Sequence, residues 1–109
     1  MLDISNAKIA TVIMLAREGR SAEGQLFSFI ADLNEDEKAS LVSVLWIGRE
    51  DYEPEELLEV KKTALAEATV PTEQYLSKQP LLASYLESGL DALGVDVTEA
   101  EDDVLRHDG

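Results

Sequence analysis

The sequence predicts an all-α fold: a compact bundle of about five helices in a single domain, residues 1–94, followed by an acidic C-terminal tail, residues 95–109. Apolar residues recur three or four positions apart along most of the chain, which is the period of one helix face. Residues that cap helices stand at the start of several of these stretches. The length of 109 residues suits one domain with one modest core.

Two amphipathic helices are expected in the first third of the chain. The first covers residues 6–18, with Ser5 as its N-cap and Gly19 at its end. Ser21 is placed to cap the second, residues 22–33. Both helices carry an apolar stripe with the same spacing, formed by Ile9, Val12, Ile13 and Ala16 in the first and by Leu26, Phe29, Ile30 and Leu33 in the second.

The third helix has the clearest start signal in the sequence. Asn34 can cap it, and Glu37 stands where a capping box has its glutamate. The run 41–47 is then apolar in almost every direction around the helix, which is typical of a helix in a core or an interface. Such a helix is either wrapped by the other helices or partly covered by a second copy, so a homodimer is one hypothesis. We expect Gly48 to end it with a left-handed cap.

The fourth helix begins with Pro54 at its first position. Pro71 interrupts it, and a short continuation restarts at Thr72, in which Tyr75 and Leu76 would point inward. Charged residues alternate with a narrow apolar stripe, so this helix should be the most exposed one. The apolar members of the stripe are Leu57, Leu58, Leu65 and Ala68.

The fifth helix closes the predicted core. Pro80 is expected at its first position and Gly94 at its C-terminal cap. Its apolar stripe is formed by Leu82, Tyr85, Leu86, Leu90 and Leu93. Six of the fifteen residues from Val95 onward are acidic and few are apolar, so we expect a mostly disordered tail there.

The charge is the strongest compositional feature, because 23 acidic residues against 9 basic ones leave a net charge of −14. Such a field repels phosphate and anionic lipid, so direct nucleic-acid binding and membrane adhesion are both disfavoured. It suits a basic protein partner, and it equally suits a solvated surface without a partner. The chain has no cysteine, no secretory signal and no apolar run of the roughly 20 residues that a membrane span needs, which together favour a cytoplasmic location.

No pattern of a cofactor, metal or catalytic site is found in the sequence. His107, the single histidine, lies in the tail without a second imidazole or thiolate to share a metal. The acidic stretches 32–37 and 50–56 do not have the spacing of a calcium loop, and helix-cap chemistry explains them better. We therefore expect no cofactor, no metal and no catalytic residue.

One group of residues is a candidate partner-binding site: Trp46, Arg49, Asp51 and Tyr52, at the end of the third helix. Tryptophan, arginine and tyrosine dominate the hot spots of protein interfaces. The alternative is structural, with Arg49 neutralising the helix C-terminus and Asp51 paired with it. Trp46 and Tyr85 are also typical of core residues whose polar atoms reach a partner.

Three segments occur in the chain in a fixed order: DLNEDE at residues 32–37, LWIGRED at 45–51 and PLLASYLESGL at 80–90. Together they resemble a family of short bacterial proteins, domain of unknown function 3775. The family pattern tends to have glycine where this chain has Glu50, and often a longer acidic insertion where this chain has only residues 18–25. The resemblance implies no activity and no catalytic or binding residue.

Three functions remain as hypotheses. The first is a non-enzymatic interaction or regulatory protein, in which Trp46, Arg49 and Tyr52 and the acidic surface hold a basic or amphipathic partner. The second is a mimic of nucleic acid that occupies the basic groove of a DNA-binding protein. The third is an enzyme that uses Arg49, Asp51 and Tyr52, which would need a concave pocket.

Overall fold

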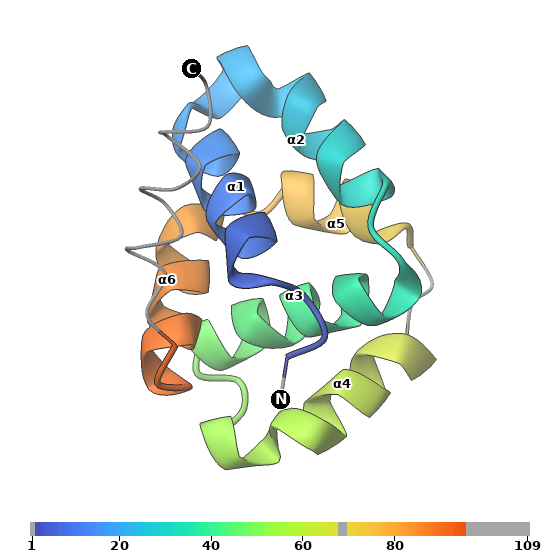
Figure 1. Cartoon of the computed structure of the whole chain (residues 1–109), viewed down its shortest axis with the longest axis vertical. Coiled ribbons are helices and arrows are strands. Elements are labelled where there is room, and N and C mark those ends of the chain that lie inside the picture. Colours follow the sequence, from blue (N-terminus) through green and yellow to red (C-terminus); the bar gives the residue numbers. More distant parts are fainter. Residues whose placement is uncertain (1, 68–69, 96–109) are drawn as a thin grey trace.

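The computed structural model describes residues 2–67 and 70–95, and within these ranges the chain is all-α, as predicted (Figure 1). The described elements are α1 Asn6–Arg17, η1 Gly19–Ala22, α2 Glu23–Ala31, α3 Glu35–Gly48, η2 Pro54–Glu56, α4 Leu57–Ala66, α5 Thr72–Ser77 and α6 Leu82–Ala92, where η marks a short 3₁₀ helix. The predicted continuation after Pro71 is a separate helix, α5. Ala68 and residues 96–109, which include most of the predicted tail, lie outside the described residues.

Helix α3 crosses the molecule between α4 on one side and α1, α2 and α5 on the other (Figure 1). It packs against α6 and α4, and also touches α5. Every residue from Ala39 to Leu45 is buried, including Ser40 and Ser43. The hydroxyl of Ser43 donates to the carbonyl of Ala39 (2.7 Å), so this polar group is satisfied inside the core. The helix is therefore wrapped by its own chain, and its apolar character no longer argues for a second copy.

Two glycines allow α3 and α6 to meet at backbone distance. A Cβ atom on Gly48 would overlap the carbonyl oxygen of Tyr85, and one on Gly89 would overlap the carbonyl oxygen of Val44. The prediction that Gly48 forms a left-handed cap was wrong, because Gly48 is the last residue of α3 and the positive φ, 65°, belongs to Glu50. Gly48 is needed for the close approach of two helices, which a single-helix pattern does not reveal.

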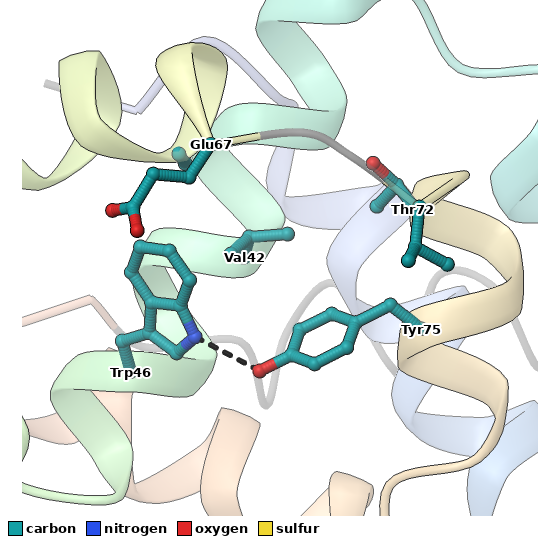
Figure 2. A pocket seen from close by; sticks show the side chains of 7 residues that line it. Val42, Trp46, Glu67, Thr72 and Tyr75 are labelled. Carbon is teal, nitrogen blue, oxygen red and sulfur yellow. Dashed lines mark hydrogen bonds between the residues drawn. The ribbon is translucent and has the colours of Figure 1, made fainter.

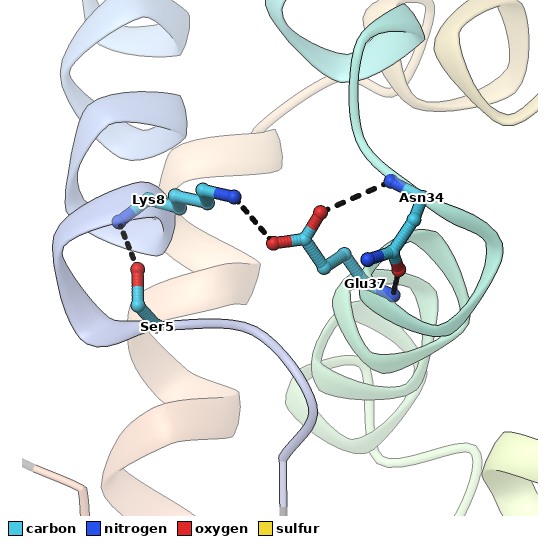
Figure 3. A network of polar contacts seen from close by, with 4 residues as sticks. All are labelled: Ser5, Lys8, Asn34 and Glu37. Atoms are coloured by element: carbon cyan, nitrogen blue, oxygen red, sulfur yellow. Dashed lines mark hydrogen bonds and ion pairs between the residues drawn. The ribbon is translucent and has the colours of Figure 1, made fainter.

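A polar network joins the start of α3 to α1 (Figure 3). The predicted capping box is present: the Asn34 side chain accepts from the Glu37 N–H (2.8 Å), and the Asn34 N–H donates to the Glu37 carboxylate (3.0 Å). The second carboxylate oxygen of Glu37 accepts from the Lys8 ammonium at 2.5 Å. Ser5, the predicted N-cap of α1, accepts from the Lys8 N–H (3.2 Å). The pKa of Glu37 is lowered, mainly by the hydrogen bond from Lys8 and next by the one from the Asn34 N–H.

Glu37→Gln should therefore change how stability depends on pH. Because the folded-state pKa of Glu37 lies below the ordinary value of 4.5, its carboxylate contributes stability above that pH, and this contribution is lost as the pH falls through the folded-state pKa. Glu37→Gln should lower the free energy of unfolding at pH 7 and flatten its decline in acid. Urea titrations between pH 3 and 7 measure both effects. Glu35→Gln, at an exposed position of the same helical turn, is the control, and equal acid profiles for the two variants would contradict the prediction.

The apolar stripes of α1, α2 and α6 face the core, as predicted. Their fully or almost fully buried members are Ile9, Val12, Ile13, Leu26, Ile30, Leu33, Leu82, Leu86 and Leu90, while Ala16, Phe29, Tyr85 and Leu93 are partly buried. The stripe predicted for α4 was wrong. Val60 and Ala64 are its buried residues, whereas Leu58 and Leu65 are exposed. The short helix η2 precedes α4, and its tighter turn changes which residues face inward.

Two predicted helix starts also differ from the structure. The Ser21 hydroxyl donates to the carbonyl of Glu18 (3.1 Å) and does not cap α2, because η1 occupies this stretch. Pro80 is not the first residue of the last helix, since α6 begins at Leu82 after Leu81 takes the left-handed conformation with a φ of 60°. A right-handed helix cannot begin until the chain has left that conformation.

Candidate functional site

The four predicted site residues do lie together at the C-terminal end of α3; we call them the Trp46 patch (Trp46, Arg49, Asp51 and Tyr52). The Arg49 guanidinium is paired with the Asp51 carboxylate at 2.7 Å. The rings of Trp46 and Tyr52 are tilted at 33° to each other with 5.8 Å between their centroids, a distance typical of favourable aromatic pairs. This ion pair is the one expected if Arg49 and Asp51 have a structural role at the end of the helix. It is also compatible with a binding role for the patch.

The turn after α3 explains why these side chains converge. The Glu50 N–H donates to the Ile47 carbonyl (3.0 Å) and the Asp51 N–H to the Trp46 carbonyl (2.9 Å). This is the pattern of a Schellman motif, whose left-handed residue is here Glu50. The motif turns Asp51 and the following Tyr52 back toward the last turn of the helix. This conformation favours glycine, which is the residue that the family named above tends to have where this chain has Glu50.

Two residues that the sequence did not assign to the site, Tyr75 and Gln79, hold the patch in place. The Tyr75 hydroxyl accepts from the Trp46 indole N–H (3.0 Å, Figure 2) and from the Arg49 guanidinium (3.4 Å). Gln79 accepts a further hydrogen bond from Arg49 (3.3 Å). The sequence predicted that Tyr75 points inward and that Trp46 reaches a polar partner. It contains no signal that pairs these two residues across 29 positions.

Arg49 is partly buried and remains positively charged. Burial on its own would lower the pKa of its guanidinium, but the Tyr75 hydrogen bond and the nearby Asp51 carboxylate together raise it. The charge is compensated within the Trp46 patch by Asp51. Arg49 therefore acts as a fixed link between α3 and α5 at every pH at which the protein is folded.

A pocket of about 290 Å³ lies beside the patch, between α3, α4 and α5 (Figure 2). In the part that the described residues form, its walls combine aliphatic and aromatic groups with one carboxylate and one aliphatic hydroxyl. The lining residues are Val42, Trp46, Ala64, Glu67, Val70, Thr72 and Tyr75. Trp46 belongs to both the patch and the pocket, whereas Arg49, Asp51 and Tyr52 do not line the pocket.

Comparison with known proteins places this site within a family. The family described as Protein of unknown function (DUF3775) matches residues 23–95, which is more than half of the chain. The chain belongs to this family. No curated protein and no solved structure matches it. The DUF3775 match extends from the start of α2 past the end of α6, so it includes the Trp46 patch and the whole lining of the pocket. DUF3775 carries no established activity, which agrees with the resemblance noted from the three sequence segments.

Residues 2–67 and 70–95 of this DUF3775 chain lack two further kinds of feature. In those residues, no three side chains of the histidine, cysteine, aspartate or glutamate type are grouped so that they could share a metal ion. No helix formed by them is both long enough and apolar enough to cross a membrane. His107 lies outside the described residues.

Proposed function

We propose that the protein is a non-enzymatic interaction or regulatory module, which holds a basic or amphipathic protein partner at the Trp46 patch. The observation that carries this proposal is that Trp46 and Arg49 both donate to the hydroxyl of Tyr75, while the Tyr52 ring lies against the Trp46 ring, next to a pocket. Aromatic residues and arginine that are held before binding lose little conformational entropy when a partner arrives.

The charge of the chain supports the choice of a basic partner. A net charge of −14 attracts a positively charged protein over a distance of about one Debye length, roughly 8 Å at physiological salt. It also disfavours nucleic acid and anionic membranes as partners. The proposal includes a cytoplasmic location, because a chain without cysteine has no need of an oxidising compartment.

The two alternative functions account for less of the structure. An enzyme that used Arg49, Asp51 and Tyr52 would need them in a concave site, yet these three side chains do not line the pocket beside them. A mimic of nucleic acid would need an array of carboxylates on an open surface. That function would leave the pocket unused, because the described residues that line it are mainly apolar and include one acidic residue, Glu67. Binding of a basic protein partner, in contrast, would use both the pocket and the negative net charge of the chain.

An affinity capture with the full chain tests this function. The immobilised protein should retain a basic partner from a lysate of its native host at low salt and release it as the salt rises. Tyr52→Ala and Arg49→Ala should each weaken capture about tenfold. Tyr52→Ala removes the ring that lies against Trp46, and Arg49→Ala removes a hydrogen bond to the Tyr75 hydroxyl. Circular dichroism checks that the variants remain folded.

The control is Arg20→Ala, which makes the same charge change at an exposed position on η1, outside the Trp46 patch. It separates the loss of a specific contact from the general effect of making the protein more acidic. If Arg49→Ala and Tyr52→Ala captured as much partner as the wild-type protein does, the proposed function would be contradicted. Capture that does not depend on salt would contradict it too. A second copy of the chain as the only bound protein would show a homodimer instead.

A further inference from the structure

The walls of the pocket beside Trp46 suit the alkyl stem of a side chain. Val42, Ala64 and Val70 contribute aliphatic surface from α3, α4 and the segment before α5. The volume of about 290 Å³ lies at the lower end of the range for ligand pockets, about 300 to 1,000 Å³. The space is thus suited to one long side chain or a small molecule, and is too small for a helix.

The polar groups of the pocket favour a positive charge at the end of that stem. Glu67 contributes a carboxylate, which accepts hydrogen bonds only. Among the residues that the structure describes, no lysine or arginine is paired with Glu67, and none lines the pocket. Thr72 adds a hydroxyl that can accept from an ammonium group. An anionic ligand would meet the carboxylate without any compensating cation.

The hydrogen bond between Trp46 and Tyr75 determines which part of the indole can meet a ligand. The indole N–H is already donated to the Tyr75 oxygen, which also accepts from Arg49, so the indole has no further hydrogen to donate and the Tyr75 oxygen is not free to accept from a cation. What remains of Trp46 in the pocket is ring surface. The face of a tryptophan ring attracts cations through its quadrupole, and does so better than any other aromatic side chain.

Neighbouring cations do not cancel this preference. Arg49 is compensated by Asp51 and lies outside the pocket lining. Lys38, which precedes Val42 by one helical turn on α3, is paired with Glu73 at 3.6 Å and does not line the pocket either. Of the described residues that line the pocket, Glu67 alone therefore contributes a charge.

We infer that this pocket binds an alkyl-linked cation, which the basic partner supplies as a lysine or arginine side chain. The stem packs against Val42 and Ala64, and the cationic head lies between the Glu67 carboxylate and the Trp46 ring. Tyr75 is a positioning residue, since it acts through the orientation of the indole. This inference rests on the proposed function for the source of the cation, but the pocket can be tested without the partner.

The test titrates the full chain with three small probes of similar length: n-butylammonium, n-butylguanidinium and n-butanol. Tryptophan fluorescence and amide chemical shifts report binding, because Trp46 is the only tryptophan in the chain. Both cations should bind at millimolar concentration, and butanol at least tenfold more weakly. Glu67→Gln should weaken cation binding about tenfold and leave butanol unchanged. Glu59→Gln, the same substitution at an exposed position of α4, should change neither.

Equal binding of butanol and butylammonium would overturn the inference, because the site would then recognise only the apolar stem. So would a wild-type cation affinity in Glu67→Gln, or the absence of shifts at the pocket residues. Each of these results leaves the proposed function standing if the partner is still captured in a manner that depends on Arg49 and Tyr52. The opposite pair of results, cation binding without partner capture, would contradict the proposed function alone.

Discussion

Gly48→Ala is expected to destabilise the protein by about 3 kcal/mol, the upper end of the roughly 1 to 3 kcal/mol that overpacking of a core costs, because the overlap is with backbone. The new Cβ atom would fall on the carbonyl oxygen of Tyr85, far inside the 3.0 Å that real Cβ contacts respect. Backbone cannot move aside as the end of a flexible side chain can. The crossing of α3 and α6 would have to open, and the buried contacts of Leu45 and Leu86 would loosen with it.

Urea unfolding followed by circular dichroism measures this effect. Gly24→Ala is the matched control, because Gly24 lies in helix α2 and nothing stands within 4 Å of its missing Cβ. The control should be neutral or more stable by about 0.5 to 1 kcal/mol, which is the usual gain of alanine over glycine in a helix. If Gly48→Ala behaved like Gly24→Ala, the close crossing described above would be wrong.

Leu45→Ala should have the second large effect, a loss of about 2 to 5 kcal/mol in the free energy of unfolding. Leu45 is fully buried and belongs to the core cluster, on the helix that packs against α4 and α6. Alanine leaves a cavity there, and the wrapped helix has little freedom to fill it. The same denaturant titration measures the loss, and a melting curve should show a matching fall in Tm.

Leu58→Ala provides the control for the leucine substitution. The Leu58 side chain is 62% exposed on α4, so its removal should change stability by less than about 0.5 kcal/mol. A small effect at Leu45, or a large one at Leu58, would contradict the arrangement of α3 and α4 in this structure. The two substitutions together therefore test the burial of Leu45 in the core and the exposure of Leu58 on α4.

The stability of the crossing and the candidate function are connected through the end of α3. Gly48 places the last turn of α3 against α6, and the next residue, Arg49, donates hydrogen bonds to Tyr75 and Gln79. A change that opens the crossing should therefore also disturb the Trp46 patch. We therefore expect Gly48→Ala both to unfold at lower urea concentration and to capture less partner than the wild-type protein.

Local sequence patterns predicted most of the fold. The stripes of α1, α2 and α6 follow from the helical period alone, because each helix needs only one apolar face. The capping box of Asn34 and Glu37 was predicted for the same reason, since both partners lie within one helical turn. The composition of the Trp46 patch was also readable, because its four residues lie within seven positions of the chain.

Only the tertiary structure decided the remaining features. The role of Gly48, the hydrogen bond between Trp46 and Tyr75, and the pocket with Glu67 each join segments that are far apart in the chain. Periodicity describes one helix at a time, whereas these features depend on where a second helix is placed. For this protein the sequence by itself determined most of the helical stretches and the burial of the helix at residues 35–48. The packing of α6 and α5 against that helix determined which glycine is indispensable and where a ligand can enter.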